Sequence, residues 1–283
     1  MTKLITSQEV ARAVYEAIPS LACDLPADIL AGLTGARALE TGDRAREVLR
    51  QLVENAGIAA CDRVPLCQDT GTVWVCLDIG PDVSVSGAVF SGVDAAVAAA
   101  YKEAHLRHSL VRDAFFDRTN TGNNTPAFCE VHPVDTPGTA RLHLMLKGGG
   151  SDNASRVVML TPGAGAPAIF DEVIACVRQK AANACPPLVV GIGIGATFDK
   201  VAGLAKRALL RPLDAPAANE RTTQLEEQLL AAINATGIGP GALGGATTAL
   251  GVKVNTAPCH IAALPLAINM GCSAMRRISL DLA

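Results

Sequence analysis

The chain has 283 residues and a formal net charge of -3 at pH 7, with 26 glycines and only 3% aromatic residues. A charge so close to neutral argues against a nucleic acid or an acidic surface as the partner, because these attract strongly basic proteins. The length allows one large α/β domain or two smaller ones. With few aromatic residues, the core must consist mainly of Ala, Val, Leu and Ile.

The N-terminal sequence predicts a helix start and shows no secretory or transit peptide. Thr6 and Glu9 have the spacing of a capping box. The long stretches without charged residues, 181–198 and 254–275, contain prolines, glycines and asparagines, so neither is predicted to span a membrane. Nine cysteines without an export signal are typical of a reducing compartment. We therefore expect a cytoplasmic protein.

Hydrophobic periodicity predicts helices and strands in a mixed α/β order. Residues 6–56 are predicted to be helical, with Gly57 ending the last helix. Further along the chain, the predicted helices cover 91–108, 170–184, 199–210 and 221–233, and the predicted strands cover 72–78, 141–147 and 188–190.

No repeat or low-complexity linker divides the sequence. We expect one large α/β domain over residues 1–283, with a helical N-terminal part at 1–58. The proline-containing segment 212–218 is the one candidate for a seam between two lobes. The motifs that carry chemistry fall at strand ends or in loops, where α/β folds place their ligand sites.

Three cysteines lie in separate loops rich in glycine and proline: Cys67, Cys185 and Cys272. Such loops allow the backbone to present sulfur to an iron–sulfur cluster. Three thiolates on a four-iron cluster would leave one iron without a protein ligand, and that iron would act as a Lewis acid. Isolated cysteines are weaker evidence than a CxxC pair, because a thiol often only fills the core.

The other cysteines have different surroundings. Cys259 lies between Pro258 and His260, so a fourth ligand remains open at this stage. Five more are on or beside predicted helices and strands and are expected to fill the core: Cys23, Cys61, Cys76, Cys129 and Cys176.

Two features suit an anionic ligand. The glycine-rich segment 147–153 follows a predicted strand and could aim several N–H groups at a carboxylate, although a simple tight turn explains it equally well. Arg107 lies near the end of a predicted helix, where an arginine is more often only solvated.

The segment 191–196, Gly-Ile-Gly-Ile-Gly-Ala, almost matches a dinucleotide-binding fingerprint after an apolar strand. Such a fold also needs an acidic residue at the end of the next strand, about 20 residues on. Asp214 is near that position but follows no predicted strand. An NAD-binding oxidoreductase is therefore the alternative from another class.

Taken together, these motifs resemble the iron–sulfur (class I) fumarate hydratase and L-tartrate dehydratase family, specifically its α subunit or N-terminal catalytic region. The order and spacing of the motifs carry the resemblance more than any one of them. The matching segments are 65–71, 106–109, 120–124, 147–151, 185–187, 191–195 and 260–272.

The resemblance implies the cofactor and the roles of individual residues. Cys67, Cys185 and Cys272 would ligate a [4Fe–4S] cluster, and Cys259 would be a bystander. Asp69 and His260 would form a catalytic pair that handles the proton of the hydroxyl group or water. The positions matching residues that touch the dicarboxylate are Gln68, Asp69, Arg107, Gly150 and Asn153.

The resemblance also implies a partner. In this family the base that takes the carbon-bound proton and further substrate-binding residues lie in a separate region, which is a β subunit in short members. We therefore expect a β subunit and an α2β2 heterotetramer, and poor turnover by this chain alone.

The substrate predicted by this resemblance is a small dicarboxylate. Segments 120–124 and 147–151 are closer to fumarase members, which favours fumarate and (S)-malate. L-tartrate is the alternative, and mesaconate also remains open. A cluster-free scaffold subunit with the same fold is a further alternative, and it would be colourless after anaerobic purification.

Overall fold

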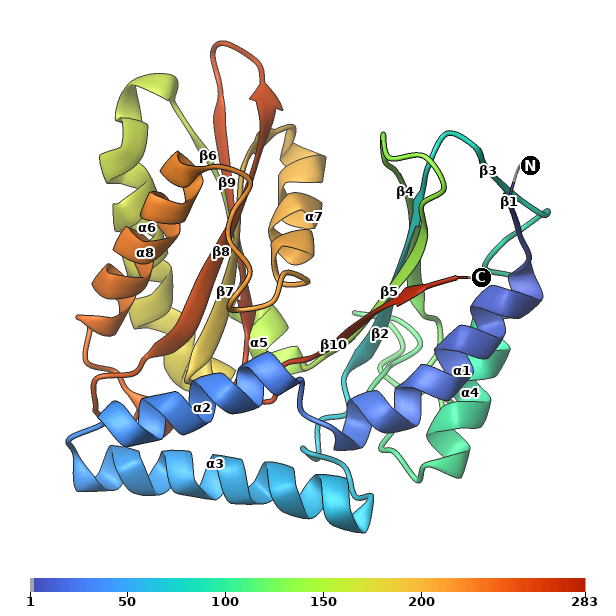
Figure 1. Cartoon of the computed structure of the whole chain (residues 1–283), viewed down its shortest axis with the longest axis horizontal. Coiled ribbons are helices and arrows are strands. Elements are labelled where there is room, and N and C mark those ends of the chain that lie inside the picture. The colour runs from blue at the N-terminus through green and yellow to red at the C-terminus, as the bar shows by residue number, and fades with distance from the viewer. Residues whose placement is uncertain (1–2, 283) are drawn as a thin grey trace. The chain divides into compact units, whose positions relative to one another are not determined.

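The computed structural model describes residues 3–282, which form two compact units (Figure 1). The first unit contains the chain up to Pro26, Ile58–Gly149, and the chain from Arg276 onward. The second unit contains Ala27–Gly57 and Gly150–Met275. Helices and strands occur in both units, so the predicted mixed α/β class is confirmed.

The expected seam near residues 212–218 lies inside the second unit, where this segment is firmly attached. The Leu213 N–H donates to Oδ2 of Asp28, 2.9 Å away. Lys253 Nζ donates to the carbonyl oxygens of Leu213 (2.9 Å) and Ala215 (2.7 Å). These bonds hold the segment against its own unit, so the division of the chain falls elsewhere.

The first unit is built on a four-stranded sheet in the order β10-β5-β2-β4. Strand β2 runs antiparallel to β5 and parallel to β4, and β10 is antiparallel to β5. A short parallel pair, β1 (Lys3–Ile5) and β3 (Val83–Val85), accompanies the sheet. The strand bounds are β2 Thr72–Ile79, β4 Phe128–Pro133, β5 Ala140–Lys147 and β10 Arg276–Asp281.

Helices α1 (Ser7–Cys23) and α4 (Val93–Glu103) supply the apolar core of the first unit together with the sheet. Alternate residues of β2, such as Val73 and Val75, belong to this core, as the two-residue period of a strand requires. The predicted capping box is confirmed, because the Glu9 N–H donates to Thr6 Oγ1 and the Thr6 N–H donates to the Glu9 carboxylate.

The second unit has a four-stranded sheet in the order β6-β9-β7-β8. Strand β7 is parallel to β8 and antiparallel to β9, which in turn is antiparallel to β6. Helices α6 and α8 cover one face and α7 covers the other (Figure 1). The bounds are β6 Arg156–Leu160, β7 Leu188–Ala196, β8 Ala249–Cys259, β9 Leu264–Gly271, α6 Gly165–Lys180, α7 Phe198–Ala208 and α8 Glu220–Asn234.

Three further short elements connect these parts: α5 (Gly149–Asn153) after β5, and the 3₁₀ turns η1 (Pro162–Ala164) and η2 (Ala181–Ala184) around α6. A last 3₁₀ turn, η3 (Pro240–Ala242), precedes β8. The predicted cysteine loop at 185 begins where η2 ends, so a helix delivers it as expected.

The glycine-rich segment 191–196 is strand, not a loop beyond a strand, which corrects its interpretation from the sequence. A Cβ on Gly191 would lie 2.3 Å from the Ala205 carbonyl oxygen, and one on Gly193 would lie 2.5 Å from that of Val201. The glycines are therefore explained by helix α7, whose backbone packs directly on β7. A phosphate-binding loop has no place in this strand.

The helical N-terminal part continues as α2 (Ala27–Leu39) and α3 (Asp43–Asp62). The prediction that Gly57 ends the last helix is wrong. A Cβ at Gly57 would meet no atom within 4 Å, and the helix continues past it until Arg63 adopts a φ of 52°. Gly57 is thus an ordinary interior residue of α3.

Length and composition alone make Ser7–Leu39 a candidate membrane span, which is weak evidence because core helices have the same properties. In the structure this stretch is two helices separated at residues 24–26. Val10, Val14 and Ile18 of α1 are fully buried in the core of the first unit. The apolar face of α1 is accounted for by this packing.

Replacing Gly191 with alanine should lower the free energy of unfolding by roughly 1–3 kcal/mol, because the new methyl group collides with the backbone of α7. The matched control is Gly203→Ala within α7, where the Cβ position is open. That change should stabilise the protein by roughly 0.5–1 kcal/mol. Urea denaturation of both variants measures the difference, and equal effects would contradict the close packing of α7 on β7.

Candidate active site

The carboxylate of Asp69 is fixed by three donors within the first unit. The Gly71 N–H donates to Oδ1 at 3.0 Å, and the Gly149 N–H donates to Oδ2 at 2.8 Å. Arg107 Nη2 lies 3.3 Å from Oδ1 and completes an ion pair. The Asp69 side chain is 23% exposed, so it is held in place and still reachable from solvent.

Glycine at position 71 makes this arrangement possible. Asp69 and Gly71 form an Asx turn, in which a carboxylate bonds the backbone two residues on. Gly71 has a φ of +80°, and a Cβ there would lie 2.7 Å from the Lys147 carbonyl oxygen. A side chain at this position would push the aspartate away from β5.

Three motifs that are distant in sequence meet around this turn. Thr70 Oγ1 donates to the Arg107 carbonyl oxygen. The fully buried Asn124 donates from Nδ2 to the Gly71 carbonyl oxygen (3.1 Å) and accepts the Ser109 N–H at its Oδ1 (2.6 Å). The structure therefore brings together Asp69 and Arg107, two of the positions that the resemblance assigns to the substrate.

Two buried side chains support the turn from within the protein, and the sequence did not single out either. The hydroxyl of Tyr101 lies 3.0 Å from the carbonyl oxygen of Thr70 and 3.3 Å from that of Gly71. Arg276 Nη2 donates to the Asp69 carbonyl oxygen at 2.7 Å. The sequence signal for Arg276 is a charged residue directly after a long uncharged stretch.

The three predicted cluster cysteines are divided between the units. Cys67, in the first unit, accepts the Asp69 N–H at its sulfur (3.4 Å). In the second unit the Ser273 N–H donates to the Cys185 carbonyl oxygen at 3.1 Å, so the loops carrying Cys185 and Cys272 lie side by side. Cys185 is exposed and Cys272 is half-buried.

These features suit cluster ligands, and the other cysteines differ from them. Burial raises the pKa of the Cys23 and Cys176 thiols, and raises that of Cys129 to about 11. These thiols fill the interior as expected. Cys61 is exposed on α3, so the expectation that it fills the core is wrong, because helix α3 turns it to solvent. Exposed Cys259 donates to the Ala263 carbonyl oxygen.

Among residues 3–282, no group of three or more His, Cys, Asp or Glu side chains is placed to hold a metal ion. The donor chemistry of the three loop cysteines fits an iron–sulfur cluster, since each lies in a loop and none is deeply buried. Their role as ligands stays a prediction.

His260 lies in the second unit, in the turn after β8. Its Nδ1 accepts the Ala262 N–H at 3.1 Å, which places the proton of the neutral ring on Nε2. Asp69 belongs to the first unit, where its carboxylate bonds Gly71, Gly149 and Arg107. The predicted pairing of Asp69 with His260 therefore stays a prediction.

The remaining predicted substrate residues have different settings. Gln68 and Asn153 are exposed, as a ligand contact requires. A Cβ on Gly150 would lie 2.7 Å from the carbonyl oxygen of Asn183, two residues before Cys185. Gly150 thus allows the start of α5 to approach the second cysteine loop within the second unit.

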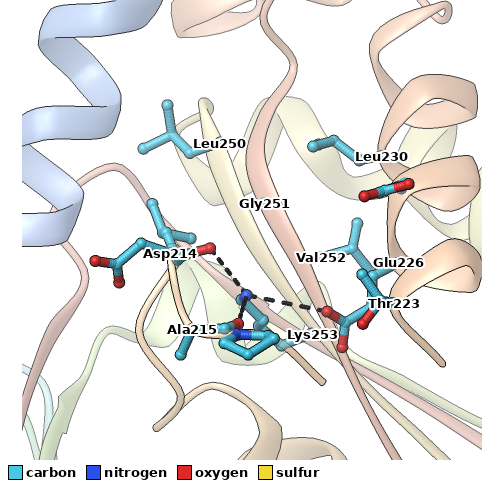
Figure 2. A pocket seen from close by; sticks show the side chains of 12 residues that line it. Asp214, Ala215, Thr223, Glu226, Leu230, Leu250, Gly251, Val252 and Lys253 are labelled. Carbon is cyan, nitrogen blue, oxygen red and sulfur yellow. Dashed lines mark hydrogen bonds and ion pairs between the residues drawn. The ribbon is translucent and has the colours of Figure 1, made fainter. Parts of the chain in front are cut away.

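A cavity of about 300 Å³ in the second unit contains none of the predicted site residues (Figure 2). Lys253 projects into it, 4% exposed, with Glu226 Oε2 at 3.9 Å in addition to its two carbonyl acceptors. Burial lowers the pKa of Lys253, and the Glu226 carboxylate opposes this change. The lysine is fully engaged in fastening the 212–218 segment, which is a structural role.

The site is that of an enzyme: a fixed carboxylate and an accessible guanidinium lie beside a cysteine loop. Comparison with known proteins identifies its class. The sequence model of the family described as Fumarate hydratase (Fumerase) matches residues 11–281. The chain belongs to this family and is a hydro-lyase.

Relatives match over nearly their whole length. A protein of Methanocaldococcus jannaschii named "Putative L(+)-tartrate dehydratase subunit alpha" is 36% identical over 283 residues, covering 96% of this chain and 99% of the relative. Proteins named "L(+)-tartrate dehydratase subunit alpha" from Escherichia coli strains UTI89 and K12 are each 30% identical over 256 residues, covering 89% of this chain and 84% of theirs.

The contribution of Tyr101 to the free energy of unfolding should depend on pH. Burial raises its pKa to about 12 from 10.0, so between these values the unfolded chain loses the phenolic proton first, and the free energy of unfolding falls as pH rises. Tyr101→Phe should remove this fall, whose slope is at most about 1.4 kcal/mol per pH unit. At pH 7 the same change should destabilise the protein by roughly 1–3 kcal/mol, because the buried Thr70 carbonyl loses the hydrogen bond from this phenol.

Urea unfolding of wild type and Tyr101→Phe between pH 7 and 11 measures both effects. Parallel pH dependence in the two proteins would show that this phenol does not stay protonated in the folded state.

Proposed function

We propose that this chain is the α subunit of an iron–sulfur hydro-lyase that removes water from L(+)-tartrate. The full-length similarity to proteins named tartrate dehydratase subunit alpha supports this substrate over fumarate, which the sequence motifs favoured. Fumarate and (S)-malate are the second candidate, because the family description names fumarate hydratase. The observation that carries the proposal is the Asp69 carboxylate fixed beside Arg107 and Cys67.

The proposed cofactor is a [4Fe–4S] cluster held by Cys67, Cys185 and Cys272. When bound, it would supply a Lewis acid through the iron that lacks a protein ligand. Cys259 is not one of the proposed ligands, and its thiol donates to the Ala263 carbonyl oxygen.

The chain's own residues have separable tasks in this proposal. Arg107 is 56% exposed, and its Nη2 bonds Asp69 and Ser109 Oγ. The remaining N–H groups of its planar guanidinium suit the plane of a substrate carboxylate. Gln68 and Asn153 offer exposed amides, and the exposed backbone of Gly150 is the last proposed substrate contact.

Asp69 is the proposed acceptor for the proton of the substrate hydroxyl. Two peptide N–H groups and a guanidinium hold the carboxylate in place, so it accepts a hydrogen bond from the hydroxyl in a fixed direction. His260 can donate only through Nε2, because Nδ1 is engaged with the backbone. Proton transfer between Asp69 and His260 would therefore use that nitrogen.

The proposal includes a β subunit, which would supply the base for the carbon-bound proton and further cationic groups. The names of the relatives as subunit alpha support a separate partner. We propose an α2β2 assembly and a cytoplasmic location. The location is proposed because a chain with nine cysteines and no recognised export signal is typical of a reducing compartment.

Changing the cluster ligands should abolish iron binding. After anaerobic purification, wild type should contain about four iron and four sulfide per chain. Cys67→Ser, Cys185→Ser and Cys272→Ser should each lose most of both, and the matched control Cys259→Ser should keep them. Loss in Cys259→Ser, or iron retained in the other three, would contradict the ligand set.

The activity should require both subunits and should favour tartrate. Together with its β subunit, the loaded protein should convert L(+)-tartrate with a higher kcat/KM than (S)-malate, while the chain alone should show little turnover of either. Absorbance assays on both substrates measure this. A preference for (S)-malate would return the assignment to fumarate hydratase, and full activity of the isolated chain would disprove the need for a partner.

A further inference from the structure

Arg276 is a buried cation for which the described part of the chain supplies no anion. Its side chain is 1% exposed. One nitrogen, Nη2, donates to the Asp69 carbonyl oxygen at 2.7 Å. Its Nε and Nη1 are buried and have no hydrogen-bond partner, and no ion pair joins Arg276 to a carboxylate among residues 3–282.

Such an arrangement is costly for a folded protein. A guanidinium cannot neutralise itself by losing a proton at any ordinary pH. Buried charges are normally paired, and buried N–H groups normally have acceptors. At least three N–H donors, one on Nε and two on Nη1, are unused here. Their acceptor should therefore come from outside the chain.

The surroundings of Arg276 indicate which acceptor this is. Arg276 is the first residue of β10 and bonds the backbone of Asp69 directly. A Cβ on Gly148 would lie 3.2 Å from Asp69 Oδ2 and 3.9 Å from Arg276 Nη2. Gly148 therefore packs against both groups, and a side chain there would crowd the Asp69 carboxylate.

The Asp69 carboxylate does not supply the missing acceptor, because it bonds the N–H groups of Gly71 and Gly149 and the guanidinium of Arg107, and no bond joins it to Nε or Nη1 of Arg276. The guanidinium groups of Arg107 and Arg276 thus both lie beside Asp69. A dicarboxylate carries two negative charges, which matches these two cations in number. In a buried setting the attraction between a guanidinium and a carboxylate is strong.

We propose that Arg276 is a further substrate-binding residue, which takes one carboxylate of the dicarboxylate through the N–H groups that the chain leaves unused. This inference rests on the proposed function, since it assumes a dicarboxylate ligand. Because Nε and Nη1 are buried in the structure, a carboxylate would reach them only after the surrounding chain moves.

The test uses the iron-loaded assembly with its β subunit and succinate, a dicarboxylate that has no hydroxyl group or double bond to react. Arg276→Gln should weaken succinate binding by roughly 10- to 100-fold in calorimetry, because a charge-assisted bond is lost. Arg276→Lys should have an intermediate affinity, since it keeps the positive charge but lacks the planar guanidinium that can donate two parallel hydrogen bonds. The matched control is Arg277→Gln, a buried neighbour with interactions inside the chain, and its affinity should stay at the wild-type value.

Iron and sulfide content, measured on the same samples, distinguishes the outcomes. Weaker succinate binding with unchanged iron supports the inference. Wild-type affinity for succinate in Arg276→Gln overturns it. A loss of iron, with unchanged succinate affinity in the fraction that still holds iron, also overturns it, because Arg276 would then serve the cluster and not the substrate. Failure of the wild-type assembly to bind iron or succinate would instead overturn the proposed function.

Discussion

The fixed orientation of Asp69 is the constraint on which the rest of the site depends. Every polar group of this residue is engaged: its N–H with the Cys67 sulfur, its carbonyl oxygen with Arg276, and its carboxylate with two peptide N–H groups and Arg107. One residue thereby sets the positions of a predicted cluster ligand, an accessible cation and a buried cation. A carboxylate held this way needs little reorganisation when a substrate arrives.

In both units, glycine allows two backbone segments to pack unusually close to each other. Gly71 lets the Asp69 turn lie on the last residue of β5, and Gly191 lets helix α7 lie on β7. The first contact shapes the site and the second shapes the core. Similar glycines in the sequence therefore have different functions, and only the atoms that surround each one distinguish them.

Local signals in the sequence predicted the local structure well. The capping box at Thr6 and the apolar runs of β2 and β5 depend on neighbouring residues and were confirmed. The sequence did not predict that the glycines of β7 face a helix. It also did not predict that the uncharged stretch 254–275 contributes to β8 and β9, which pair with opposite edges of β7, because both features depend on distant partners. Only the family resemblance assigned Asp69 and Arg107 to one site, and it did not predict their ion pair. The unpaired state of Arg276 is a property of its surroundings, which no local pattern records.

The order of the segments along the chain has a consequence for synthesis. Strand β10 lies beside β5 in the first sheet, yet it follows the whole of the second unit in sequence. During translation the second unit can therefore fold while β5 still presents an open edge, the kind of edge that invites pairing with another chain. The nascent protein depends on its last strand to close that edge, and Arg276 reaches Asp69 in the same late step.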